Sequence, residues 1–251
     1  MSTIPGGNYI TDTHPGEVLH GIGDGDVIFG TFGHDVIYGG AGSEYIETDG
    51  SYNHIFGGTG DDLIMAFGSH DFLQGGTGND AIMTFGDGHD TILGGTGNDT
   101  ITAGGADNLI HAGPGNDYIT GGTGGDTILG GAGHDTLVAG DGKEMLMAGS
   151  GDNMLVAGSG NDTMVGGAGH DTFVFDSGGG KDVVMNFHDG DILQIQKNIN
   201  GLHIAAPTDL LSHVTDVAGN AVITLGHETI TLVGVKAEDV HSNPSGYFTV
   251  H

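Results

Sequence analysis

Acidic side chains recur along this sequence at a spacing that could bind a hard metal ion. From Asp26 to Asp171 an Asp, Glu or Asn stands at every ninth residue, with one ten-residue step between Asp80 and Asp90. The series is Asp26, Asp35, Glu44, Asn53, Asp62, Asp71, Asp80, Asp90, Asp99, Asn108, Asp117, Asp126, Asp135, Glu144, Asn153, Asp162 and Asp171. Calcium takes six to eight oxygen ligands, among them carboxylates and backbone carbonyls. The series therefore indicates a row of sites for a hard cation such as calcium.

Each acid closes a glycine-rich turn and starts a short strand. The unit GGTGNDAIM begins at Gly75, and GGTGNDTIT begins at Gly94. Glycine adopts positive φ at little steric cost, so the chain can turn sharply every nine residues. The apolar residue two places after each acid, such as Ile82 or Ile101, should point inward while its neighbours point outward. Self-similarity over residues 21–174 predicts a repeat architecture.

The repeat resembles the glycine-aspartate nonapeptide G-G-x-G-x-D-x-U-x of the RTX (repeats-in-toxin) proteins. Residues 57–65 match it at every defined position, and so do the units that begin at Gly75, Gly94, Gly121, Gly130 and Gly166. This resemblance implies an all-β fold, a right-handed parallel β-roll with two nonapeptides per coil, followed by a C-terminal β-rich cap. It also implies several bound Ca²⁺ ions.

The resemblance assigns calcium binding to the sixth-position aspartates and to carbonyls at the first and third turn positions. The predicted metal ligands are Asp26, Asp35, Asp62, Asp71, Asp80, Asp90, Asp99, Asp117, Asp126, Asp135, Asp162, Asp171, Gly57, Thr59, Gly75, Thr77, Gly94 and Thr96. Sites that would involve Glu44, Glu144 or the asparagines of the series stay open, because their side chains are longer or uncharged.

Two nonapeptides per coil place alternate turns on opposite edges of the roll. We call the edge that begins with Asp26 the first edge and the edge that begins with Asp35 the second edge. Aspartates run unbroken on the first edge from Asp62 to Asp135, whereas the second edge keeps one adjacent aspartate pair, Asp71 with Asp90. We expect calcium to concentrate on the first edge.

Phenylalanine replaces a turn glycine on the second edge at Phe32, Phe67 and Phe85. We expect these rings to pack locally in place of a missing ion; the alternative is an exposed apolar strip available to a partner. Histidines that precede the acid in their turns, such as His70, should face solvent.

Composition excludes several partners. Of the 251 residues, 33 are acids and four are lysines, with no arginine, so the formal net charge is −29. Nucleic acid and anionic membrane surfaces are unsuitable, because phosphate binding needs cationic side chains. No stretch approaches the roughly 18 apolar residues of a membrane-spanning helix. Cysteine is absent, which excludes disulfides and thiolate metal sites.

The chain divides into three segments by composition. Residues 1–20 are a polar lead-in that we expect to cover the first coil, with a disordered tail as the alternative. Residues 21–174 are the repeat array. Residues 175–251 have mixed sequence, with strands expected at 182–187 and 191–195, a helical turn at 209–214, and antiparallel strands at 216–225 and 229–235. We interpret them as a cap that also holds the secretion signal.

Localisation follows from the resemblance. The N-terminus lacks the basic and apolar regions of a cleaved signal peptide. RTX proteins are exported by a type I secretion system that reads an uncleaved C-terminal signal. We therefore expect an extracellular protein, free or associated with the cell surface, and the type I machinery as one partner.

No catalytic motif is present: the sequence has no His-Glu-x-x-His pair, no Gly-x-Ser-x-Gly elbow and no phosphate loop. We predict a secreted calcium-binding protein, not an enzyme, that folds on calcium outside the cell. Its role would be structural, at the surface or in the extracellular matrix of a biofilm, with self-assembly. Two alternatives stay open: a module that binds cell-surface polysaccharide or ice through a threonine row (Thr59, Thr77 and Thr96), and an accessory module of a secreted enzyme.

Overall fold

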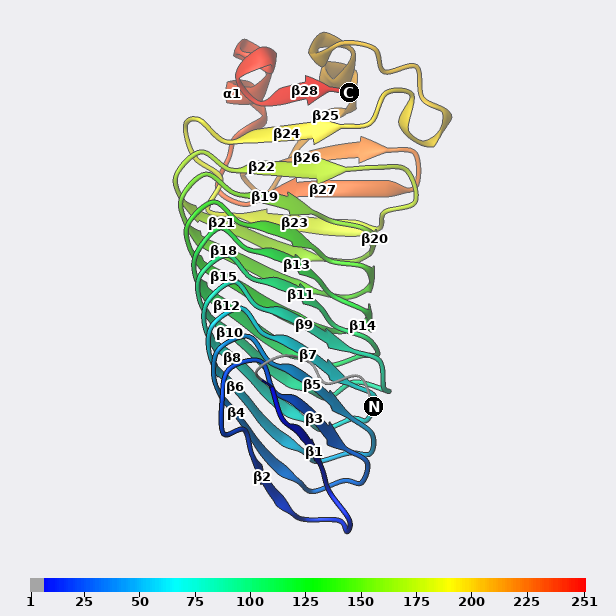
Figure 1. Cartoon of the computed structure of the whole chain (residues 1–251). Coiled ribbons are helices and arrows are strands. Elements are labelled where there is room, and N and C mark those ends of the chain that lie inside the picture. Colours follow the sequence, from blue (N-terminus) through cyan, green and yellow to red (C-terminus); the bar gives the residue numbers. More distant parts are fainter. Residues whose placement is uncertain (1–6) are drawn as a thin grey trace.

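Alternating inward and outward side chains build two long parallel sheets that face each other. The computed structural model describes residues 7–251, and Figure 1 shows a stack of coils that ends in a cap at the C-terminus. Each coil of the array contributes one strand to each sheet and turns once at each edge. The predicted all-β parallel β-roll with two nonapeptides per coil is confirmed.

Sheet A holds the strands that follow the first-edge acids. Its order is β1 (Tyr9–Thr11), β3 (Val27–Gly30), β5 (Tyr45–Thr48), β7 (Leu63–Ala66), β9 (Ala81–Thr84), β11 (Thr100–Thr102), β13 (Tyr118–Thr120), β16 (Thr136–Val138), β19 (Met154–Val156), β22 (Thr172–Phe175), β24 (Ile192–Ile195) and β28 (Phe248–Val250). All of its pairings are parallel.

Sheet B holds the strands that follow the second-edge acids. Its order is β2 (Val18–His20), β4 (Val36–Ala41), β6 (His54–Thr59), β8 (Phe72–Thr77), β10 (Thr91–Thr96), β12 (Leu109–Pro114), β15 (Thr127–Ala132), β18 (Met145–Ser150), β21 (Thr163–Ala168), β23 (Lys181–Met185), β27 (Glu228–Leu232), β26 (Asn220–Leu225) and β25 (Val214–Val217). Most of its strands are longer than those of sheet A, because they continue into the glycine-rich turns of the first edge.

The core consists of two ladders of apolar side chains, one from each sheet. Ile101 of β11, for example, lies in register with Ile82 and Ile119. All three are fully buried, as are their counterparts in sheet B, such as Ile92. Full burial of one such side chain stabilises the fold by about 1.5–3 kcal/mol. The ladders therefore hold successive turns at a fixed spacing along each edge.

The two edges use different turn conformations. First-edge turns have glycine with positive φ at the second and fourth positions, as at Gly76 (124°) and Gly78 (132°). On the second edge, up to Asn108, the left-handed residue is instead the one before the acid: His34, Tyr52, His70, His89 and Asp107. From Gly121 onward the second-edge turns resemble the first-edge turns, because their fourth residue has positive φ. Short strands pair along this part of the edge: β14 (Thr123–Gly124), β17 (Asp141–Gly142) and β20 (Ser159–Gly160). The second edge thus changes turn type part-way along the roll.

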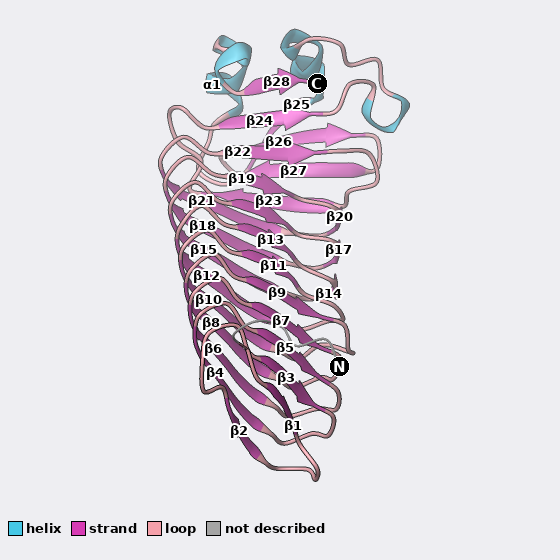
Figure 2. Ribbon diagram, viewed as in Figure 1, coloured by secondary structure: helices cyan, strands magenta, loops and turns pink. Residues whose placement is uncertain are grey.

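Both sheets continue past residue 174 into the C-terminal segment. β23 and β24 extend the parallel ladders, β25–β26–β27 form an antiparallel hairpin array whose last strand pairs with β23, and β28 pairs with β24. The helices are η1 (Ile199–Gly201), η2 (Pro207–His213), α1 (Ala237–Ser242) and η3 (Pro244–Gly246), and Figure 2 shows them at this end only of the described chain. The strands expected at 182–187, 191–195 and 229–235 correspond to β23, β24 and β27, and the helical turn at 209–214 corresponds to η2. The strand expected at 216–225 is wrong as a single strand, because a turn at Ala218 and Gly219 divides it into the end of β25 and β26. The elements α1 and β28 were not predicted. The boundary at residue 174 stays a prediction.

At the other end, β1 and β2 belong to the polar lead-in and pair with β3 and β4. The lead-in therefore adds a coil to the roll over the residues that are described. The part of the prediction that concerns residues 1–6 lies outside the described residues.

Candidate metal centre

The sixth-position aspartates lie inside the turns. All twelve predicted aspartate ligands are at most 3% exposed. On the first edge, from Glu44 onward, the backbone N–H of each sixth-position residue donates to the side-chain Oδ1 atom of the sixth-position residue one coil further on. The bond runs from Asp62 to Asp80 at 2.9 Å, from Asp80 to Asp99 at 2.8 Å, and from Asp99 to Asp117 at 2.7 Å. The second edge has the same type of bond, as from Asp71 to Asp90 at 2.9 Å. The structure therefore brings same-edge acids into ladders; in the described chain the ladders are interrupted between Asp26 and Glu44 on the first edge and between Asp126 and Glu144 on the second.

The second carboxylate oxygen of most of these residues has no partner. In residues 7–251 the Oδ2 atom is buried without a hydrogen bond in ten of the twelve: Asp35, Asp62, Asp71, Asp80, Asp90, Asp99, Asp117, Asp135, Asp162 and Asp171. Asp26 and Asp126 differ, because their Oδ2 atoms accept backbone N–H groups of their own turns. A buried carboxylate oxygen without a donor is costly unless a cation neutralises it. These rows of oxygens fit a hard divalent cation.

First-position glycines make room for these oxygens. A methyl group added at Gly57, Gly75 or Gly94 would overlap Oδ2 of the aspartate that ends the same turn. None of these three glycines has positive φ, so backbone conformation does not require glycine there. The carboxylate and a backbone carbonyl oxygen one coil further on together occupy the space that a side chain would need at these three glycines, whereas Ala112 holds the same position in the turn that ends at Asp117.

Burial raises the pKa of several of these carboxyl groups when no metal is bound. It raises the pKa of Asp71 and Asp80 from 3.8 to about 7 and that of Asp117 to about 6, and neighbouring carboxylates of the same edge add to the rise. Asp26 is an exception: burial acts to raise its pKa, but hydrogen bonds from Asn8, Ile22 and Gly23 outweigh it and the pKa is lowered. A bound cation would stabilise the ionised forms.

The predicted carbonyl ligands lie beside the carboxylates. The third-position residues Thr59, Thr77 and Thr96 have exposed side chains, and their carbonyl oxygens accept N–H groups from the preceding first-edge turn at 2.7–2.9 Å. A carbonyl oxygen has a second lone pair that remains for a metal. Within the described residues no three His, Asp or Glu side chains converge as a side-chain-only site would. Buried carboxylate oxygens together with backbone oxygens are ligands that calcium accepts, and the assignment of these residues as ligands stays a prediction.

The aromatic residues of the second edge lie on its surface. Phe32, Phe67 and Phe85 are 41–51% exposed, and Phe67 stacks on Phe85 with ring centroids 4.8 Å apart. Phe67 and Phe85 thus pack locally on each other, as expected, but all three rings remain substantially exposed, which agrees with the alternative of an exposed apolar strip. That they replace a missing ion stays a prediction. The turn histidines face solvent, as predicted, and His70 and His89 stack at 4.9 Å.

Three buried acids of the C-terminal segment were missed by the sequence reasoning. Asp182 and Asp191 accept the N–H groups of Asp162 and Asp171, both at 2.9 Å, and so continue the second-edge and first-edge ladders. Each stands two residues before an inward apolar residue, a signal that could have identified them. Glu228 of β27 is 4% exposed and accepts the N–H of Gly178 at 2.7 Å.

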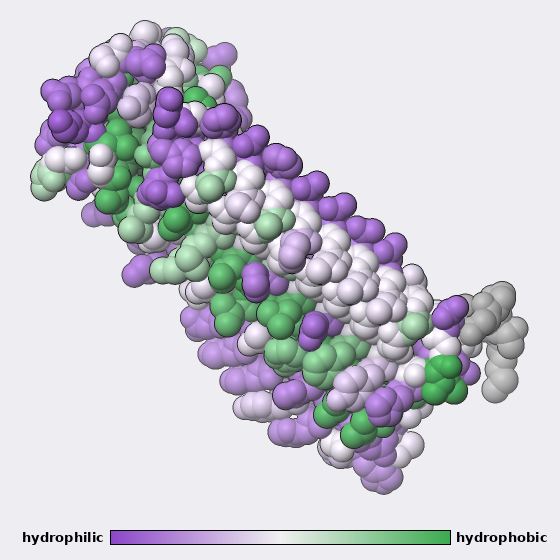
Figure 3. Space-filling view, turned by 90° about the vertical axis from the view of Figure 1, so that its left-hand side faces the viewer, coloured by the Kyte–Doolittle hydropathy of each residue, from purple (hydrophilic) through white to green (hydrophobic). Residues whose placement is uncertain are grey.

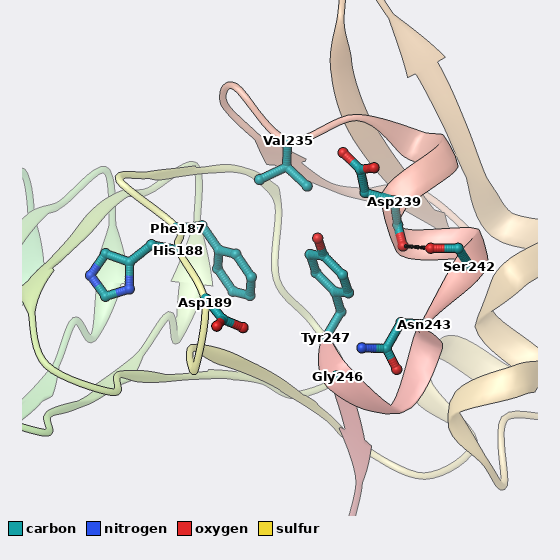
Figure 4. A pocket seen from close by; sticks show the side chains of 9 residues that line it. All are labelled: Phe187, His188, Asp189, Val235, Asp239, Ser242, Asn243, Gly246 and Tyr247. Atoms are coloured by element: carbon teal, nitrogen blue, oxygen red, sulfur yellow. Dashed lines mark hydrogen bonds between the residues drawn. The ribbon is translucent and has the colours of Figure 1, made fainter.

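A cavity of about 380 Å³ lies between the last first-edge turn and the cap (Figure 4). Phe187 stacks on Tyr247 there at 5.7 Å, and Asp189 and Asp239 also line the cavity. Neither carboxylate belongs to the acid ladders. The cavity is thus separate from the predicted metal sites.

Stacked glycine-rich turns, each with a buried aspartate, define a calcium-binding parallel β-roll. The sequence matches the family described as "RTX calcium-binding nonapeptide repeat (4 copies)" over 20–82 and 86–184, in overlapping segments. The chain therefore belongs to the RTX calcium-binding nonapeptide repeat family. No curated protein sequence matches it.

Two solved structures resemble the chain at low sequence identity. One is the extracellular lipase LipA from Serratia marcescens, with 20% identity and a TM-score of 0.42 over 82% of this chain and 40% of that one. The other is a hyperactive, Ca²⁺-dependent, β-helical antifreeze protein from an Antarctic bacterium, with 19% identity and a TM-score of 0.42 over 78% of this chain and 86% of that one. The chain therefore spans less than half of the lipase. No helix among residues 7–251 is both long enough and apolar enough to cross a membrane.

Proposed function

We propose that this chain is a secreted calcium-binding β-roll that folds when it meets calcium outside the cell and acts as a structural protein of the cell surface or extracellular matrix. The observation that carries the proposal is the set of ten buried Oδ2 atoms without a hydrogen-bond donor. At neutral pH these carboxylates repel one another and oppose folding. Calcium shared between adjacent turns would cancel that repulsion and contribute its binding energy to folding.

Calcium should prefer the first edge. First-position glycines leave space for Oδ2 in four of its five turns from Asp62 to Asp135, Ala112 being the exception, and Asp62, Asp80, Asp99, Asp117 and Asp135 follow one another without interruption. The second edge has a different turn conformation up to Asn108, and neutral asparagines separate its aspartates. We therefore assign the first-edge run as the principal site, with further ions on the second edge after Gly121.

Uncharged sheet faces support a structural role with self-assembly. From β4 to β21 the outward positions of sheet B hold no Asp, Glu or Lys, and those of sheet A from β3 to β22 hold a single charged residue, Glu47. Several outward apolar side chains are well exposed, among them Leu109 (46%) and Met145 (44%). In a chain with net charge −29, the charge lies at the edges and leaves the faces free for lateral contact.

A calcium titration tests the proposal. Far-UV circular dichroism should change from disordered to β as calcium rises to millimolar levels, and light scattering should then report growth in particle mass. Magnesium at equal concentration is the control, because it fits carbonyl-rich sites poorly. A full β spectrum in chelator would contradict calcium-coupled folding, and a monomer at all calcium concentrations would contradict assembly.

A second candidate function is recognition of a regular surface, such as a polysaccharide or ice, by the first edge. Thr59, Thr77 and Thr96 lie in register on adjacent strands. Beside them Asn79 and Asn98 are held by ladder hydrogen bonds, with the Asn98 N–H donating to Asn79 Oδ1 at 2.8 Å. Figure 3 looks onto this edge, where a pale band runs between hydrophilic and hydrophobic rows.

The threonine row is short, since Pro114 and Ala132 occupy the next positions in register. Measurements of thermal hysteresis and of glycan binding distinguish this function from the structural one. Thr77→Val would abolish a recognition signal and leave calcium-dependent folding unchanged.

A further inference from the structure

The second edge of the roll ends against a glutamate of the cap. Within the array, each turn faces an acid that belongs to the coil one step further on. After Asp182 no further coil of the array follows on this edge. Ile230 of β27 stands in register with Asp182, and the acid that β27 supplies is Glu228, two residues earlier; it is 46 residues from Asp182 in sequence and lies beside the turn Ser177–Lys181.

Two buried carboxylates converge on this turn. Asp182 is 2% exposed and Glu228 is 4% exposed. A methyl group built on Gly179 would lie 3.6 Å from Asp182 Oδ2 and 3.7 Å from Glu228 Oε2, so both oxygens face the same space above this glycine. Gly179 does not have positive φ, and its missing side chain leaves that space open.

Neither of these two oxygens has a hydrogen-bond donor in the described chain. Asp182 uses Oδ1 for the N–H of Asp162, and Glu228 uses Oε1 for the N–H of Gly178. The nearest basic group to Glu228 is the exposed His227 ring, whose Nε2 is 4.0 Å from Oε1. Two buried anions without a counter-ion are unstable side by side, and each would favour a shared cation.

We propose that Asp182 and Glu228 bind a calcium ion at the end of the second edge, with Glu228 acting for the acid of the next coil. This site lies outside the nonapeptide array and rests on the proposed calcium-dependent function of the chain. Because β27 pairs directly with β23, ion binding here fastens the hairpin β26–β27 onto the last coil. Docking of the cap thereby becomes calcium-dependent.

Glu228→Gln separates the charge of this residue from its hydrogen bond. The amide oxygen still accepts the N–H of Gly178, so the cap should fold without calcium at least as well as in the wild type, because repulsion with Asp182 is removed. Native mass spectrometry should find one calcium fewer per chain. Glu238→Gln is the matched control, since Glu238 lies in the same cap with its side chain 75% exposed. It should bind as many ions as the wild type.

Hydrogen exchange in β26 and β27 reads out the docking directly. At calcium a hundredfold above the dissociation constant of the site, exchange in this hairpin should slow about 100-fold in the wild type. In Glu228→Gln this slowing should disappear while β7, β9 and β11 still gain protection. Gly179→Ala, whose methyl fills the space between the carboxylates, should give the same two results.

Unchanged ion counts together with unchanged calcium protection of the hairpin in both variants would overturn the inference. A wild-type chain that binds no calcium and gains no protection anywhere would instead overturn the proposed function. The two failures are therefore distinguishable.

Discussion

Removal of calcium should make the stability of the roll depend steeply on pH. A rise in pKa from 3.8 to about 7, as for Asp71 and Asp80, corresponds to about 4 kcal/mol for each group at neutral pH. Asp117, at about 6, adds about 3 kcal/mol. Together these groups oppose folding by on the order of 10 kcal/mol, which is comparable to the whole stability of a typical domain.

The sign follows from proton binding. The folded pKa values lie above the unfolded value of 3.8, so the folded chain holds more protons than the unfolded chain between about pH 4 and 7. The contribution of these bound protons to the stability of the folded, calcium-free chain is complete below the unfolded pKa of 3.8 and is lost as pH rises through the folded pKa values. With calcium present the dependence reverses, because protons compete with the ion for the same oxygens.

Circular dichroism of decalcified protein tests this reasoning. At pH 7.5 the spectrum should be disordered, and at pH 5.5, still above the sequence pI of about 4.3, a β spectrum should appear without any metal. In calcium the β spectrum should be present at pH 7.5 and the apparent affinity should fall towards pH 5.5. A decalcified chain that is equally folded at both pH values, or less folded at pH 5.5, would refute the charge argument.

Three substitutions test the site and the core. Asp99→Asn keeps the Oδ1 acceptor but should lose at least one bound ion and lower the melting temperature in calcium and not in chelator; the exposed Asp107→Asn is its control. Gly75→Ala places a methyl group against the carboxylate of its own turn and should lower the unfolding free energy by about 1–3 kcal/mol or more in a denaturation series with calcium. Gly125→Ala is its control and should lower the unfolding free energy less, because the nearest atom to the added methyl group is 3.3 Å away. Ile101→Ala should lower the unfolding free energy by about 2–5 kcal/mol in the same series, and a loss below 1 kcal/mol would contradict the ladder core.

Periodicity in the sequence was sufficient to predict a repeat architecture, and the resemblance to the RTX nonapeptide then implied the parallel β-roll. Every acid from Asp26 to Asp171 is fixed by nine-residue spacing, and that spacing also determines which side chains are buried, so Ile82 and Ile101 could be placed in register from the sequence alone. The positions of the acids and of the buried side chains are determined by short stretches of sequence, because each unit interacts mainly with its neighbours in the stack.

Features that depend on contacts between distant parts of the chain were harder to predict from the sequence. Asp182 was missed because it follows Asp171 by eleven residues and the glycine spacing changes before it. The contact of Glu228 with this turn depends on how the cap returns to the roll, which no local pattern encodes. Phe67 and Phe85 were expected to pack locally, and they do stack on each other, but the sequence did not show that the stacked rings would remain about half exposed.

The conformation of the second edge was also not predictable from composition. His70 and His89 adopt left-handed φ of 60° and 62°, whereas the first edge places glycine at its positive-φ positions. Both classes of turn end in an aspartate, so the acid alone does not reveal which class is present. The residue before the acid does not reveal it either, because His134 and His170 hold that position on the first edge without positive φ.

Length variation in this chain falls entirely on one side of the roll. The additional residue at Gly88 is taken up by a second-edge turn, where isolated bridges join it to Ser69 and Ala106, and the two additional residues before Asp182 also lie on the second edge. First-edge turns keep one length throughout. The roll can therefore accept inserted loops along one flank, as a natural variation or for the display of foreign peptides, without breaking the spacing of the opposite flank.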